Sequence, residues 1–175
     1  QAGFATPMSV NISARHLAHP DFVPHLKAVL DAHPRVDAGL LQLEVLETAT
    51  LGDLKRIAAI MARCNDLGVR LAIDDFGIGY GAVNSLRSLP VRSIKIDRSF
   101  IHNMLEDDDD LATVQSVIGL ATAFHREVIA EGVETPRHRQ ALLKLGCHQI
   151  QGHGIARPMP AANMQIWMQE HALHH

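Results

Sequence analysis

Short apolar runs alternate with segments of helical periodicity along most of the chain. The runs are rich in aliphatic and β-branched residues and are bounded by glycine, proline or polar residues, which is typical of buried strands. Strands are therefore expected at residues 8–12, 40–46, 69–75, 93–97, 127–131 and 148–151. A segment of helical character follows each run. Repeated strand–helix alternation predicts an α/β fold in which helices cover a parallel sheet.

The helical segments carry their own start and stop signals. Apolar residues from Leu54 to Met61 recur at helical spacing and form one stripe. Thr135 and Pro136 are typical of an N-cap followed by proline at the first helical position. The acidic run 106–110 indicates a solvated helix start, where the helix dipole favours negative charge. Helices are expected at residues 20–33, 53–61, 82–88, 111–124, 135–145 and 164–173.

The predicted strands share a second property, because a polar residue lies at or near the end of each. These residues are Asn11, Glu44, Asp74, Lys95, Glu131 and Gln151. Polar residues at the same end of successive parallel strands predict a TIM-like (β/α) barrel, since active sites in that fold lie at the carboxyl ends of the strands.

Asp74 and Asp75 are the strongest candidates for a metal site. Two adjacent carboxylates repel each other and are costly to bury without a cation, and a divalent metal suits such hard oxygen ligands. The glycine-rich segment 76–81 follows directly and can fold over the site. Taken alone, an Asp-Asp pair at a strand end is more often a turn or a helix cap. Lys95 could likewise pair with Asp97 and have no role in a site.

The length of the chain limits the barrel. A closed eight-stranded α/β barrel usually needs about 250 residues, whereas this chain has 175. The pattern gives about six of the eight strand–helix units, so we expect one domain over residues 1–175 that lacks the opening units of its barrel.

Composition excludes several classes of protein. The formal charge of −3 and the pI of about 6.5 argue against binding to duplex nucleic acid or to an anionic membrane. No run approaches the roughly 20 apolar residues of a membrane span, and no signal peptide opens the chain. Cys64 and Cys147 are expected to be buried thiols in a reducing cytoplasm, and the 12 histidines are expected mostly at the surface.

Six motifs resemble, in order, those of the EAL domain family: SVNIS, LEVLET, AIDDFGIGYG, VRSIKIDRSF, VIAEGVET and QIQGHGIARPMP. They extend from Met8 to about Pro160. The resemblance implies a TIM-like barrel that hydrolyses cyclic di-GMP to linear pGpG with two Mg²⁺ or Mn²⁺ ions. It identifies the chain as the C-terminal portion of such a domain, without the first strands and the motif that names the family.

The resemblance also implies residue roles. The implied metal ligands are Asn11, Glu44, Asp74, Asp75 and Glu131. The implied catalytic residues are Asp74, Lys95, Glu131 and Gln151, and Gln151, Gly77 and Gly79 are implied to contact substrate. Glu47 and Glu134 are implied to brace the glycine-rich loop. Ile78 and Gly81 depart from the family, which commonly has a hydroxyl residue near each position.

Three functions are compared. The first is a cyclic di-GMP phosphodiesterase, and the second is a degenerate EAL domain that binds the nucleotide without cutting it. The intact ligand set favours the enzyme. The third is another metal-dependent barrel enzyme, one that stabilises an enolate. The collinear motifs argue against it. The resemblance further implies a homodimer and a cytoplasmic domain whose parent protein could be membrane-anchored elsewhere. The 175-residue fragment alone is expected to be inactive and poorly stable.

Overall fold

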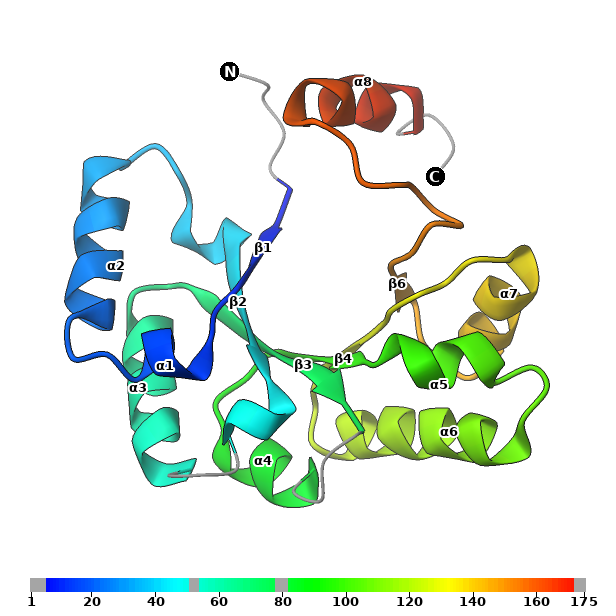
Figure 1. Ribbon diagram of the computed structural model, residues 1–175. Coiled ribbons are helices and arrows are strands. Elements are labelled where there is room, and N and C mark those ends of the chain that lie inside the picture. Colours follow the sequence, from blue (N-terminus) through cyan, green and yellow to red (C-terminus); the bar gives the residue numbers. More distant parts are fainter. Residues whose placement is uncertain (1–5, 51–53, 78–81, 172–175) are drawn as a thin grey trace.

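Six parallel strands form one curved sheet in the computed structural model, and the sheet makes a half-barrel (Figure 1). The structure describes residues 6–50, 54–77 and 82–171. The strands follow the order of the sequence across the sheet. They are β1 (Met8–Asn11), β2 (Leu41–Leu46), β3 (Arg70–Phe76), β4 (Ser93–Ile96), β5 (Glu127–Ala130) and β6 (Gln149–Ile150). The predicted α/β fold with six strand–helix units of a TIM-like barrel is thereby confirmed.

Most helices lie around the outside of this arc in Figure 1, whereas the last helix lies across its open side. The helices are α1 (Ala14–Leu17), α2 (Phe22–Ala32), α3 (Leu54–Asp66), α4 (Ala82–Ser88), α5 (Arg98–Asn103), α6 (Asp108–Ala123), α7 (Pro136–Lys144) and α8 (Ala161–His171). Two 3₁₀ turns, η1 (Ala38–Leu40) and η2 (Glu47–Thr50), flank β2. The sequence analysis missed α1 and α5. It also placed Asp97 in a strand, whereas Asp97 is the N-cap of α5.

N-cap hydrogen bonds define where two of the helices, α6 and α7, begin. The Thr135 side chain accepts a hydrogen bond from the backbone N–H of His138, which confirms Thr135 as the N-cap of α7. The Asp107 side chain accepts from the N–H groups of Asp109 and Asp110. Helix α6 therefore begins at Asp108, earlier than the expected start at Leu111, and its first turn is acidic as predicted.

Side chains alternate between the two faces of the sheet. Leu71 and Ile73 belong to the apolar core that the strands share with the helices, and neither has exposed surface. Ala72, which lies between them, faces the concave side. There Ser93 Oγ donates a hydrogen bond to Gln42 Oε1 at 3.2 Å, across the small side chain of Ala72. The helices thus cover an apolar face, and the opposite face is polar.

The two thiols lie inside the molecule, as the composition predicted. Cys64 and Cys147 are both free and almost fully buried. Burial raises the pKa of the Cys64 thiol to about 11, and it also raises the pKa of Cys147. Among the helices in the described ranges, none is long and apolar enough to cross a membrane.

The segments that follow β5 and β6 are joined through their backbones. Val133 N–H donates to the carbonyl of Gln151 at 3.0 Å, and Gly154 N–H donates to the carbonyl of Val133 at 2.9 Å. A Cβ atom built on Gly152 would lie only 2.3 Å from the Val133 backbone, so only glycine permits this approach. This contact fixes Gln151 beside Glu131, at the carboxyl edge of the sheet.

Candidate metal and catalytic site

Lys95 lies at the centre of a buried cluster of carboxylates. Its Nζ is 2.6 Å from Glu44 Oε2, 3.2 Å from Asp74 Oδ1 and 2.6 Å from Glu131 Oε1. The three acids come from β2, β3 and the end of β5, and only 4% of the Lys95 side chain is exposed. The alternative, in which Lys95 pairs with Asp97, is not what the structure shows.

The carboxylates decide the protonation state of this lysine. Burial opposes protonation of Lys95, but hydrogen bonds to Glu131 and Glu44 and the charge of Asp74 outweigh it. The pKa of Lys95 therefore lies above its ordinary value. The side chain is a fixed cation at neutral pH.

A β-bulge brings both aspartates of β3 to the site. Successive residues of a regular strand point to opposite faces. Here the register with β4 shifts between Ile73 and Phe76, and Asp75 has a positive φ of 51°. Asp74, Asp75 and Glu131 can each offer an oxygen such that all three oxygens lie within 4.8 Å of one another. Left-handed backbone at a non-glycine residue costs about 1–3 kcal/mol and is concentrated at functional sites.

The cluster carries more negative than positive charge. Four carboxylates, those of Glu44, Asp74, Asp75 and Glu131, face the single ammonium of Lys95 in this part of the described structure. Four negative charges less one positive charge leave an excess of three when all the acids are ionised. Burial, together with the charges of Asp74 and Glu44, raises the pKa of Glu131 despite its hydrogen bond to Lys95. Such a site favours a further cation.

Asp97 links the cluster to α5. Its carboxylate caps the helix by accepting from Ser99 N–H at 2.8 Å and also from the Ser99 hydroxyl. Asp75 shares a hydrogen bond with Asp97, so burial and the neighbouring acids Asp74 and Asp97 raise the pKa of Asp75. Burial acts in the same direction on Asp97, but the hydrogen bonds from Ser99 and Asp75 outweigh it and lower the pKa of Asp97.

Glu47 holds the start of the glycine-rich segment. Its side chain is fully buried, and its Oε2 accepts a hydrogen bond from the N–H of Gly77 at 3.0 Å. Gly77 has a φ of 109°, and a Cβ there would lie 3.2 Å from the ring of Phe100 in α5. The hydrogen bond joins Glu47 to the first residue of the glycine-rich segment that follows Phe76, and the bracing role of Glu47 stays a prediction. Gly79, Ile78 and Gly81 lie outside the described residues.

Asn11 and Gln151 lie at the two sides of the cluster. Asn11 ends β1, is exposed and is in register with Glu44, so their side chains leave the sheet on the same face. Gln151 directly follows β6 and is exposed, and its backbone N–H donates to the carbonyl of Ala130 at 2.8 Å. The structure therefore brings Glu44, Asp74, Asp75, Lys95 and Glu131 together, with Asn11 and Gln151 at the rim.

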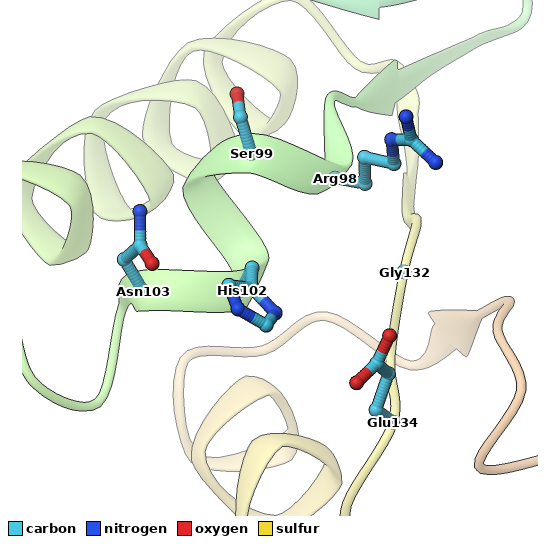
Figure 2. A pocket seen from close by; sticks show the side chains of 6 residues that line it. All are labelled: Arg98, Ser99, His102, Asn103, Gly132 and Glu134. Atoms are coloured by element: carbon cyan, nitrogen blue, oxygen red, sulfur yellow. The ribbon is translucent and has the colours of Figure 1, made fainter.

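Glu134 lines a cavity beside helix α5, and its expected bracing of the glycine-rich segment stays a prediction. Figure 2 shows its carboxylate directed into a space between the segment after β5 and helix α5. The cavity has a volume of about 350 Å³ and is lined by Arg98, Ser99, His102, Asn103, Gly132 and Glu134. The sequence analysis missed the α5 side of this cavity. The Asp97–Ser99 capping pattern was the available signal for a helix start there.

The family comparison agrees with this arrangement of acids at the carboxyl edge of a parallel sheet. A family model described as the EAL domain matches residues 1–158. The chain belongs to the EAL domain family. Both the resemblance of its six motifs and the half-barrel fold are consistent with that membership.

Among the relatives of this EAL chain are two proteins of Pseudomonas aeruginosa. The bifunctional diguanylate cyclase/cyclic di-GMP phosphodiesterase MucR is 36% identical over 157 residues, which cover 90% of this chain and 23% of MucR. The cyclic di-GMP phosphodiesterase NbdA is 35% identical over 161 residues, which cover 92% of this chain and 20% of NbdA. The chain thus spans less than a quarter of the length of these relatives.

Solved EAL structures share the fold. The PaMucR phosphodiesterase in complex with c-di-GMP has a TM-score of 0.86 at 36% identity, with 90% of this chain and 64% of that chain covered. The EAL domain of Mycobacterium smegmatis DcpA has a TM-score of 0.88 at 34% identity, with 94% and 73% covered.

Proposed function

We propose that this EAL chain carries the site of a metal-dependent phosphodiesterase that hydrolyses cyclic di-GMP to linear pGpG. The observation that carries the proposal is the convergence of Glu44, Asp74 and Glu131 on Lys95, with Asp75 beside them. Relatives named as cyclic di-GMP phosphodiesterases support the substrate and the reaction. The structure of PaMucR with c-di-GMP supports the same ligand.

The side chains present fit a divalent cation. The excess of negative charge, the hard oxygen donors and the raised pKa values of Asp75 and Glu131 all favour one. We propose Mg²⁺ or Mn²⁺, held by Asn11, Glu44, Asp74, Asp75 and Glu131. When bound, such ions lower the pKa of a coordinated water and neutralise charge on phosphate oxygens.

The protein side chains supply the remaining functions of the site. Lys95 is a buried, permanently charged donor, so it stabilises the negative charge that develops on the phosphate during attack. Glu47 positions Gly77 and thereby the start of the glycine-rich segment. Gln151 offers an amide at the rim of the cluster, where it can orient water and phosphate.

The experiment follows linear pGpG by chromatography, using the full-length protein that carries this chain and cyclic di-GMP with Mn²⁺. Asp74→Asn is expected to lower the rate about 100-fold or more, because it removes a charge from the centre of the site. Asp66→Asn, at the end of α3, is the matched control and should leave the rate unchanged. Tight nucleotide binding with no product from the unaltered protein would instead identify the non-catalytic receptor.

Two further properties complete the proposal. A homodimer is proposed because the family resemblance implies pairing near the glycine-rich segment, and α5 and Gly77 lie in contact there. A cytoplasmic location is proposed because the two buried thiols lack a disulfide partner.

A further inference from the structure

A second cavity lies at the end of the sheet opposite to the carboxylate cluster. Its lining includes Arg70 at the start of β3, Arg92 just before β4 and Glu127 at the start of β5. Arg126 and the α3–β3 turn at Gly68 complete it. Its volume is about 760 Å³, which is within the usual range for small-molecule sites.

The charges around this cavity do not balance. Arg92 pairs with Glu127, with Nη2 at 2.8 Å and Nε at 3.0 Å from the same carboxylate oxygen. Burial disfavours ionisation of Glu127, but hydrogen bonds from Arg92 and Gln149 and the charges of Arg92 and Arg70 outweigh it, and the pKa of Glu127 lies below its usual value. Arg70, Arg92 and Arg126 thus face one carboxylate, and three positive charges less one negative charge leave an excess of two at the cavity. Arg70 acts on Glu127 through its charge, but within the described ranges neither Arg70 nor Arg126 has a carboxylate within ion-pair distance.

Arg126 has an unmet hydrogen-bonding requirement. Its Nη2 donates to the carbonyl of Leu89 at 3.4 Å, which is a long contact. Its Nε is buried and, among the described residues, has no hydrogen-bond partner. A buried donor on a charged group is costly to leave unpaired. The buried Nε is itself closed to a ligand, so an anion in the cavity would pair with the charge of the Arg126 guanidinium group and with that of Arg70, because guanidinium groups match phosphate geometry.

We infer that this cavity binds a phosphate dianion, either as inorganic phosphate or as the phosphate of a small phosphorylated metabolite. The three arginines exceed the single charge of Glu127 by two, and Arg92 is the one that pairs with Glu127 directly. The site lies at the amino ends of the strands, so it is separate from the proposed hydrolysis of cyclic di-GMP and does not depend on it.

The test titrates the full-length protein that carries this chain with inorganic phosphate at constant ionic strength, with chloride as the balancing anion and a chelator present to exclude metal binding. Amide chemical shifts report the position of binding. Saturable shifts at Gly68, Arg92 and Arg126 are expected. GMP in place of phosphate should move the same amides, which would show that a phosphorylated metabolite is accepted.

Charge variants make the test specific. Arg126→Gln and Arg70→Gln are each expected to weaken phosphate binding about tenfold, as the loss of a charged hydrogen bond predicts. Arg139→Gln, at an exposed position of α7, is the matched control and should have no effect. Glu127→Gln should strengthen binding by about twofold or more, since it removes the one negative charge at the cavity.

Thermal unfolding shows whether each variant is folded. Arg70→Gln tests the site independently of Arg126, whose Nε is buried. Shifts that fail to saturate, or that map to another part of the molecule, would overturn the inference. So would equal weakening by Arg139→Gln and Arg126→Gln, or weaker binding by folded Glu127→Gln.

Discussion

At the scale of single residues, Lys95 holds the candidate site together in the absence of metal. One ammonium contacts Glu44, Asp74 and Glu131, and these carboxylates are between 5% and 16% exposed. Removing the cation leaves buried negative charge without compensation. Lys95 therefore has a structural effect that is separable from its proposed role in turnover.

Lys95→Met should destabilise the metal-free protein by about 3–5 kcal/mol, the usual cost of breaking a buried ion pair on one side. The same change should not weaken Mn²⁺ binding, because it removes a competing cation, yet turnover should be lost. Urea unfolding, calorimetric metal titration and the rate of pGpG formation measure the three quantities. Lys27→Met, at an exposed pair with Asp31, is the control and should change stability by less than about 1 kcal/mol. A parallel loss of metal binding and turnover would contradict this account.

The raised pKa values of Asp75 and Glu131 predict a pH-dependent response to metal. Burial is the first cause of each shift, and neighbouring carboxylates add to it. A raised carboxyl pKa stabilises the fold at low pH, and this contribution is lost as the pH rises through the folded-state value. Metal binding needs the ionised form, so protons compete with it.

Mn²⁺ should therefore raise the unfolding temperature more at about pH 7.5 than at about pH 5. The first pH lies well above the ordinary pKa of a carboxyl group, and the second lies near it. Differential scanning calorimetry with and without Mn²⁺ measures this difference. Asp74→Asn should reduce the response at both values. Equal stabilisation of the unaltered protein at the two pH values would show that these carboxyl groups do not bind the ion.

At the scale of elements, the sequence predicts the strands and the N-cap of α7 well, because these depend on local pattern. The apolar run before Asp74 and the cap at Thr135 are visible without any tertiary contact. The bulge that turns Asp75 toward Glu131 depends on register with β4, which no local pattern contains. The long-range meeting of Lys95 with Glu44, 51 residues apart, could be inferred only from the strand-end rule and the family resemblance.

Close backbone contact between the β5 and β6 ends gives an element-scale prediction. Gly152→Ala should destabilise the protein and shift Gln151, because its Cβ would meet the Val133 backbone at 2.3 Å. Gly119 lies inside α6, and a Cβ added there would have no neighbour within 4 Å, so Gly119→Ala should stabilise by about 0.5–1 kcal/mol. Chemical denaturation measures both variants. A neutral Gly152→Ala would show that the two segments do not need to touch.

At the scale of the whole molecule, the described sheet does not close. β1 pairs with β2 alone and β6 with β5 alone within the described ranges, and Met8 and Val10 of β1 are 52% and 45% exposed. Open strand edges and exposed apolar side chains promote association between copies.

The 175 residues on their own should therefore self-associate and show little turnover, whereas the full-length protein should form a defined homodimer. Light scattering at micromolar concentration, followed by the rate assay on the same samples, tests both statements. A monomeric fragment that unfolds cooperatively and is fully active would contradict the prediction for the fragment. A monomeric full-length protein would contradict the prediction of pairing.

The most direct test of the central claim is metal withdrawal from the unaltered full-length protein during turnover of cyclic di-GMP. The rate of pGpG formation should fall at least about 100-fold when a chelator removes Mn²⁺, because metal ions contribute several kcal/mol to such reactions. It should recover when excess Mn²⁺ is restored. A rate that is unchanged by the chelator, or the absence of pGpG at any metal concentration, would contradict the account.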